Sequence, residues 1–305
     1  MHFYEQHDYV EYENLMSAIG YTAPPYSQFN HIKKINDKLV YDVNYNIGML
    51  GFRTIPDNLL NKGAPFHFII AGDSNTFSEG CSDKDSIAAQ LSPLLKNYYV
   101  YNLGQRGAGP HNMLALMKNY PFEDLIKEKN GIFLYNFFPT YMFERVIGSK
   151  SYSGWDHGRS PYYDLDRNGK LIRNGYFKDR TFTSIFYNFL NSFKWLNKLI
   201  PNLPRINDHH IEIVTKIFLE MKKEYLFKFP SGKFYIIINN SYQAATHESL
   251  GLIKNLKKYK LDYIEVPFNP DFEKGYILKD LHLNKKGQAT QTKFIAQEIL
   301  KKLNQ

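Results

Sequence analysis

The chain has 305 residues, of which 43% are hydrophobic and 22% are charged, so it can bury roughly three quarters of its unfolded surface and is not a disordered polypeptide. Its single cysteine, Cys81, excludes an intrachain disulfide and a CxxC metal or redox site. The formal net charge of +8 is spread along the chain and accompanies no nucleic-acid-binding motif, which favours a solvated surface over a polyanion partner.

The amino-terminal region carries neither an export signal nor a regular alternation of elements. Residues 1–15 mix acidic and aromatic side chains and lack the basic and apolar regions of a signal peptide. Apolar stretches such as 131–138 are too short to span a bilayer. We therefore expect a cytoplasmic location by default, or an exported protein if a leader has been trimmed. Residues 1–62, with a short strand at 39–44, are interpreted as a wrap on a main domain at 63–305.

The rest of the chain alternates between strand-like and helix-like segments. Short apolar runs rich in β-branched and aromatic residues predict five strands, at 66–71, 98–103, 131–138, 233–239 and 262–268. Apolar residues at spacings of three and four predict helices at 87–95, 113–125, 211–226, 250–259 and 284–303. This alternation predicts an α/β fold, a three-layer α/β/α flavodoxin-like sandwich with a five-stranded parallel sheet. Catalytic residues should then follow directly after strands.

Residues 141–207 interrupt the alternation and are interpreted as an inserted aromatic subdomain. Residues 167–169 read Arg-Asn-Gly between two strand-like runs, which predicts a hairpin turn. Apolar residues from 185 to 200 then form a helical stripe that Pro201 ends. We expect this stripe to dock onto the protein's own core, the alternative being contact with a partner or a membrane surface.

The first predicted strand of the main domain ends in the run AGDSNTFSEG, which places Asp73 and Ser74 in the turn between a strand and a helix. A serine nucleophile needs a base for its proton and amides for the negative charge of a tetrahedral intermediate. A turn into a helix presents such amides. The alternative is that Ser74, or Ser78, only caps a helix.

A base for this serine is available near the other end of the chain. The run KDLHLNKKGQ follows the fifth strand and precedes the last helix, and it places His282 two residues after Asp280. This spacing lets a carboxylate support the imidazole while the other ring nitrogen faces a serine. The alternative for an isolated DxH is a surface loop. Together, Ser74, Asp280 and His282 are compatible with a catalytic triad at one edge of the sheet.

Taken together, these segments resemble the SGNH hydrolases, the GDSL-type esterase and acyltransferase superfamily. GDSNTFSEG is similar to its first block, YNLGQRGAG to its second and DLHLNKKG to its last, and the runs VYDVNYNIGMLGFRTIPDN and GPHNMLALM resemble a bacterial subgroup often encoded among surface-glycan genes. The resemblance implies that Ser74 is the nucleophile, His282 the base and Asp280 its support. It also implies that Gly107 and the Ser74 amide donate hydrogen bonds to the oxyanion.

The third block departs from the family pattern. It normally supplies an asparagine from a GxND turn, whereas this chain reads GIFLYNFFPTYMFER after residue 130. Asn136 is the nearest side-chain amide and the candidate third oxyanion donor, although strict alignment to the strand end places Pro139 there. The loss of one oxyanion donor typically lowers turnover about a hundredfold to a thousandfold. If no group replaces the third donor, the protein is a weak enzyme or a pseudoenzyme.

The remaining motifs do not indicate a cofactor or a metal. GQRGAG has the spacing GxxGxG and follows the second core strand, so it does not match a dinucleotide loop, and no metal-ligand cluster emerges. The resemblance favours an esterase or O-acyltransferase acting on a short acyl ester, such as acetyl on a carbohydrate. The alternatives are a non-catalytic glycan-binding protein of the same fold and a lipase-like esterase. Rings that could stack on a sugar, or pack the insertion itself, are those of Tyr152, Trp155, Tyr162 and Tyr163.

Overall fold

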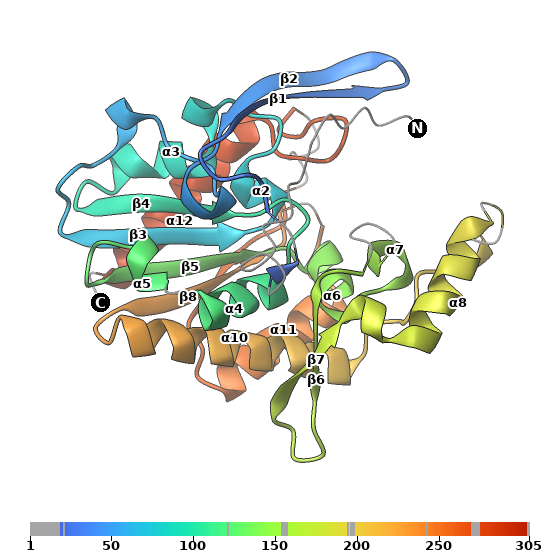
Figure 1. The fold of residues 1–305 in the computed structure, drawn as a ribbon. Helices are drawn as coiled ribbons and strands as arrows, with labels where there is room; N and C mark the ends of the chain where they lie inside the picture. The colour runs from blue at the N-terminus through green and yellow to red at the C-terminus, as the bar shows by residue number, and fades with distance from the viewer. Residues whose placement is uncertain are drawn as a thin grey trace.

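A five-stranded sheet forms the centre of the molecule (Figure 1). The computed structural model describes residues 19–303 apart from 21, 121, 154–157, 194, 196–198, 242 and 270–274. The sheet consists of β3 (Phe66–Gly72), β4 (Tyr98–Gly104), β5 (Gly131–Phe137), β8 (Lys233–Asn239) and β9 (Tyr263–Val266). All four pairings are parallel and the order is β4-β3-β5-β8-β9. The predicted strands and the predicted α/β class are confirmed, although the last strand is shorter than expected.

Helices cover both faces of this sheet (Figure 1). One face packs against α3 (Ile87–Leu91) and α12 (Lys285–Leu303), and the other against α4 (Pro110–Asn119), α10 (Asp208–Lys228) and α11 (His247–Lys258). Side chains alternate between the two faces along each strand. In β3, for example, Phe68 and Ile70 belong to one apolar cluster, whereas Ile69 and Ala71 belong to the other. The alternation produces the three layers predicted from the sequence.

Prolines shorten two of the predicted helices. The expected helix at 113–125 is divided into α4, which ends at Asn119, and α5 (Phe122–Leu125). Tyr120, which precedes the proline at position 121, has an extended backbone, as residues before proline prefer. The segment expected at 87–95 is α3 followed by the 3-10 turn η4 (Ser92–Leu94). Among the described helices none is both long and apolar enough to cross a membrane.

The amino-terminal region contains an antiparallel hairpin of which only the second strand was predicted. It consists of β1 (Gln28–Ile35) and β2 (Lys38–Asn46). Asn36 and Asp37 join the strands with φ angles of 48° and 59°, a conformation that asparagine and aspartate tolerate better than most residues. Three short 3-10 turns follow before α3, namely η1 (Met49–Gly51), η2 (Asp57–Leu59) and η3 (Asp83–Asp85).

The insertion lies between β5 and α10. It contains α6 (Pro139–Ile147), α7 (Lys150–Ser153), β6 (Pro161–Leu165), β7 (Leu171–Tyr176), the 3-10 turn η5 (Phe177–Asp179) and α8 (Thr181–Ser192). β6 and β7 pair antiparallel, so the predicted hairpin turn is confirmed. Tyr152 and Tyr163 are buried, Tyr152 against Gly107 and His111 and Tyr163 in the main apolar cluster. Protein therefore covers these two rings, which contradicts their use as a sugar platform. Trp155 lies outside the described residues.

The predicted docking of the apolar stripe onto the core is wrong. Helix α8 projects away from the body of the molecule (Figure 1), and its main contacts are with α7 and η5. Tyr187 and Leu190 are buried against these elements, whereas Ile185 and Phe189 are 63% and 55% exposed. The periodicity of the stripe correctly indicated a helix, but a helix that packs only against a small insertion can cover only one of its faces.

Candidate active site

The nucleophile candidate begins a short helix at the carboxyl end of β3. Ser74 is the first residue of α2 (Ser74–Phe77), and Asp73 caps the helix by accepting a hydrogen bond from the backbone N–H of Asn75 at 3.0 Å. Gly104, the last residue of β4, lies directly against this turn, because a Cβ added to it would be 2.2 Å from the backbone nitrogen of Phe77. A glycine at the end of β4 therefore permits the close approach that positions α2.

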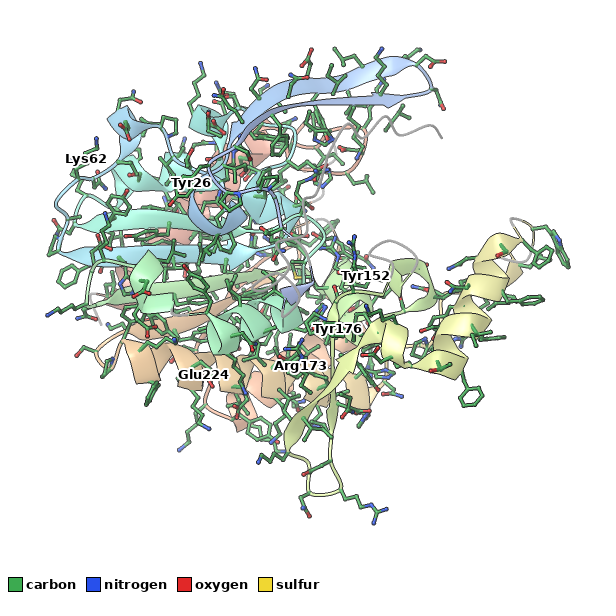
Figure 2. The ribbon with its side chains drawn as sticks, viewed as in Figure 1. Tyr26, Lys62, Tyr152, Arg173, Tyr176 and Glu224 are labelled. Carbon is green, nitrogen blue, oxygen red and sulfur yellow. The ribbon has the colours of Figure 1, made fainter. Side chains whose placement is uncertain are left out.

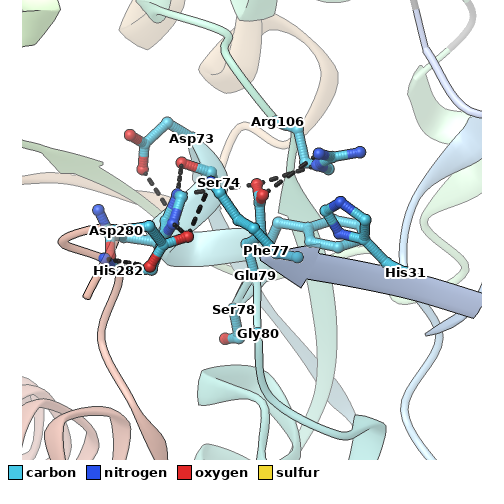
Figure 3. A network of polar contacts seen from close by, with 12 residues as sticks. His31, Asp73, Ser74, Phe77, Ser78, Glu79, Gly80, Arg106, Asp280 and His282 are labelled. Atoms are coloured by element: carbon cyan, nitrogen blue, oxygen red, sulfur yellow. Dashed lines mark hydrogen bonds and ion pairs between the residues drawn. The ribbon is translucent and has the colours of Figure 1, made fainter. Parts of the chain in front are cut away.

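The structure brings the three predicted triad residues together. His282 Nε2 lies 2.9 Å from Ser74 Oγ, and His282 Nδ1 lies 2.8 Å from Asp280 Oδ2 (Figure 3). Ser74 is 208 residues from His282 in the chain. In this arrangement the carboxylate fixes the tautomer of the imidazole and its orientation, so that Nε2 can accept the hydroxyl proton. The contact geometry is that of a serine nucleophile with its base.

Asp280 has a second partner from the amino-terminal hairpin. Lys33 Nζ, on β1, lies 2.8 Å from Asp280 Oδ2, the oxygen that also faces His282. Burial alone would raise the pKa of Asp280, but the hydrogen bond and charge of His282 and those of Lys33 lower it to about 2. Asp280 is therefore a carboxylate throughout the neutral range.

A second carboxylate, that of Glu79, faces the imidazole of His282 and comes from the same GDSNTFSEG run as Ser74. Glu79 Oε2 lies 3.7 Å from His282 Nε2 (Figure 3). Glu79 is almost fully buried, and it accepts hydrogen bonds from Arg106 Nε at 2.9 Å and from the Tyr41 hydroxyl at 2.8 Å. Burial would raise the pKa of Glu79, but Arg106 and then His282 hold it well below its ordinary value of 4.5. An ionised carboxylate thus lies beside His282 Nε2, the ring nitrogen that also contacts Ser74 Oγ.

The two carboxylates control the ionisation of His282. Burial of the ring would lower its pKa, but the charge of Glu79 and the hydrogen bond and charge of Asp280 raise it above the ordinary value of 6.5, against a smaller opposing effect of Lys33. The sequence analysis did not assign Glu79 to the site. A signal was present, since Glu79 lies within the GDSNTFSEG run, five residues after Ser74.

Glu79, Asp280 and His282 are residue types that bind metals, but their carboxylate oxygens are already engaged by cationic side chains. One ligand atom from each of Glu79, Asp280 and His282 lies within 4.8 Å of the others. However, Arg106 directs its guanidinium at Glu79, and Lys33 directs its ammonium at Asp280. These positive charges occupy the carboxylate oxygens that a cation would need. The cluster therefore suits a proton relay better than a metal.

Two arginines make hydrogen bonds to the turn that carries Ser74. Arg53, which is buried, donates from Nη1 to the carbonyl oxygens of Phe77 and Ser78 and from Nη2 to that of Cys81. Arg145 donates from Nη1 to Asp73 Oδ2 at 3.0 Å. Arg53 comes from the amino-terminal region and Arg145 from α6, so segments on both sides of β3 support the turn that carries the serine.

Asn136 and Gly107, the two candidate oxyanion donors outside α2, lie near the ends of different strands. Asn136 lies in register with Gly72 at the end of β5, but its Nδ2 donates to Thr76 Oγ1 at 3.3 Å and its Oδ1 accepts from Asn239 at 3.1 Å. Thr76 lies in α2 and Asn239 ends β8, so these contacts join Asn136 to both elements. Gly107 follows β4 with a φ of 71°, and its carbonyl oxygen accepts from the Tyr152 hydroxyl.

Comparisons with known proteins gave matches among solved structures only. No family model and no curated protein matches the chain. It is similar to a two-domain esterase active on acetylated mannans, with 12% identity, coverage of 80% of this chain and 51% of that chain, and a TM-score of 0.43. It is also similar to an acetyl xylan esterase from the rumen bacterium Butyrivibrio proteoclasticus, with 12% identity, coverage of 78% of this chain and 64% of that chain, and a TM-score of 0.45. A third similar structure is a putative lipolytic G-D-S-L family protein from Desulfitobacterium hafniense, with 11% identity, coverage of 75% of this chain and 98% of that chain, and a TM-score of 0.39.

The chain thus spans about half of the length of the mannan esterase. The positions of the motifs in the fold can be read from the chain's own residues. The GDS run follows the first strand of the parallel sheet, the DLH run precedes the last helix, and Ser74, His282 and Asp280 meet at the carboxyl ends of the strands. This sheet order and these motif positions are the ones that the resemblance to the SGNH hydrolases implies.

Proposed function

We propose that the protein is a serine esterase or O-acyltransferase. The observation that carries the proposal is the continuous chain of contacts from Ser74 Oγ through His282 to Asp280. Ser74 Oγ attacks the ester carbonyl carbon while its proton passes to His282 Nε2. The tetrahedral intermediate then collapses, its alkoxide leaves with the proton from His282, and Ser74 remains acylated.

The second half of the reaction uses the same groups in the reverse order. A water molecule, or a hydroxyl of an acceptor, gives its proton to His282 Nε2 and attacks the acyl carbon. Ser74 then leaves with the proton and the free enzyme is restored. Hydrolysis and transfer share these steps and differ only in which hydroxyl reaches the acyl-enzyme.

The backbone amides of Ser74 and Gly107 are the proposed oxyanion donors. Ser74 contributes the first amide of α2, and amides at the start of a helix have no partner within the helix. Asn136 is the candidate third donor: Thr76 engages one N–H of its Nδ2, and the amide carries a second N–H. If Asn136 does not contribute, two amides replace three donors, and we expect a slower enzyme than a member with a complete set, by about a hundredfold.

The proposed substrate is a short acyl ester, such as acetyl, on a carbohydrate. The small exposed fraction of Ser74, 5%, supports a small acyl group over a long one. The carbohydrate part rests on the likeness of the runs near residues 40–58 and 109–117 to the subgroup encoded among glycan genes. A lipase-like preference is the competing outcome of the test below.

Labelling with a fluorophosphonate probe, combined with turnover of nitrophenyl esters of increasing chain length, tests the proposal. The native protein should label and should prefer acetate, whereas Ser74→Ala and His282→Ala should each abolish labelling and turnover, because triad members act as a unit. Ser192→Ala, on the exposed face of α8, is the matched control and should behave as the native protein. Labelling that persists in Ser74→Ala would exclude Ser74 as the nucleophile, and a strong preference for long chains would replace the carbohydrate assignment with a lipase-like one.

A further inference from the structure

Helix α8 and the residues that follow it expose a row of large apolar side chains. We call this row the apolar ridge and define it by its residues and exposed fractions: Phe182 (89%), Ile185 (63%), Phe186 (49%), Phe189 (55%), Phe193 (43%), Trp195 (62%) and Leu199 (73%). Figure 2 shows side chains of this helix directed outward from the body of the molecule. Proteins seldom leave so many neighbouring large apolar groups in water unless the surface binds something.

Most of the ridge lies on α8, whose buried residues pack against the rest of the insertion. Phe182, Phe186 and Phe189 follow one another at spacings of four and three, so they lie on one side of α8, and Phe193 follows the helix with its ring 5.3 Å from that of Phe189. Tyr187 and Leu190 are the buried residues of the helix. The helix is therefore anchored to the insertion by one face and leaves the ridge available.

The charges along this segment indicate what covers the ridge. From residue 181 to residue 207 the sequence contains Lys194, Lys198 and Arg205 and no aspartate or glutamate, whereas Arg180 donates to the carbonyl oxygens of Ile147 and Gly148. A second copy of the same segment would bring like charges together. An anionic surface, in contrast, is attracted by them, and a helix with aromatic and aliphatic groups on one side and basic residues nearby has the composition of a segment that lies in a lipid interface.

We propose that the apolar ridge binds the surface of an anionic lipid bilayer, with α8 lying in the plane of the interface and its rings inserted among the headgroups and the first acyl carbons. Tryptophan and phenylalanine suit this depth because their rings are apolar and flat. The contact is peripheral and is separate from the triad, so it does not depend on the proposed chemistry. It would deliver the protein to esters carried at a membrane surface.

Cosedimentation with lipid vesicles tests this inference. The full chain is mixed with vesicles of phosphatidylcholine alone, or with vesicles in which roughly a quarter of the lipid is phosphatidylglycerol. Binding should be at least about tenfold stronger to the anionic vesicles and should weaken in high salt, since the charge attraction is screened. A shift of tryptophan fluorescence to shorter wavelength should accompany it.

The variant Phe182→Ser/Phe186→Ser/Phe189→Ser removes the centre of the ridge and should weaken vesicle binding by about tenfold or more. These side chains are exposed, so the fold and the turnover of a soluble aryl acetate should be retained. Phe227→Ser is the matched control, because Phe227 is 82% exposed on a different helix, and it should bind vesicles as the native protein does.

Three results would overturn the proposal. Native protein that stays in the supernatant with the anionic vesicles would exclude a lipid surface. Equal binding of the native protein and the triple variant would place lipid contact elsewhere. A dimer that forms in the absence of lipid and that the triple variant abolishes would assign the ridge to a second copy of the chain instead.

Discussion

The substitution Glu79→Gln tests whether the second carboxylate takes part in the proton transfer. Glu79 Oε2 lies 3.7 Å from His282 Nε2. Over this distance a unit charge pair interacts by about 4 kcal/mol at an effective dielectric constant near 20, and by about 1 kcal/mol in bulk water. Arg106 is paired with Glu79 and offsets part of the attraction. We therefore expect a loss of about 2 kcal/mol in transition-state stabilisation, which is roughly a thirtyfold decrease in kcat/KM.

The pH profile gives this prediction its specific signature. Glu79 raises the pKa of His282 by stabilising the imidazolium, so removal of its charge should lower that pKa. The base is active when neutral, and kcat/KM falls as the pH drops through its pKa. In Glu79→Gln the acidic limb of the profile should therefore move to lower pH while the plateau decreases. A simple loss of folded protein would lower the plateau without moving the limb.

The assay is the hydrolysis of a nitrophenyl acetate across a range of pH, with the folded fraction checked by circular dichroism. Tyr41→Phe is the matched control, because it removes one hydrogen bond to Glu79 and keeps the charge. It should change kcat/KM by less than about threefold, since Glu79 Oε1 also accepts from Arg106 Nη2 at 3.2 Å and so keeps a partner. If Glu79→Gln retained both the native plateau and the native acidic limb, the electrostatic role of Glu79 would be refuted.

Three further changes probe the supports of the site. Lys33→Met removes a positive charge that lowers the pKa of His282, so the acidic limb of kcat/KM should move to higher pH, opposite to the Glu79 variant; an unchanged limb would contradict the contact. Arg53→Met removes hydrogen bonds to three buried carbonyl oxygens together with the ion pair to Asp83. It should decrease the free energy of unfolding in urea by about 3–5 kcal/mol, whereas a decrease below about 1 kcal/mol would argue against this role. Gly104→Ala forces a Cβ to 2.2 Å from the Phe77 nitrogen and should displace the nucleophile turn, with at least a tenfold loss of kcat that native-like turnover would disprove.

Much of the fold could be predicted from the sequence because it is encoded by local patterns. The apolar runs and the helical spacings each reflect residues that are close in the chain, and parallel strands joined by helices have few ways to pack. The positions of Ser74 and His282 follow for the same reason, since each lies in a short run directly after a strand. Their meeting was predictable because the carboxyl ends of parallel strands share one edge of the sheet.

The tertiary structure alone decided what surrounds those residues. Lys33 and Arg53 come from the amino-terminal region, and no local pattern relates them to Asp280 or to the nucleophile turn. Asn136 was assigned from its nearness to a strand end, and its contacts with Thr76 and Asn239 are visible only in the packed molecule.

The apolar stripe of α8 illustrates the same limit. Periodicity specifies that a helix has an apolar face, and it does not specify what that face meets. Whether such a face is buried depends on whether the connecting segments can bring it to the core. The insertion carries α8 away from the sheet, and Phe182 and Ile185 remain in solvent. The sequence thus determined the elements and the candidate site residues, while packing between distant segments determined the ionisation of those residues, their supports and the exposed ridge.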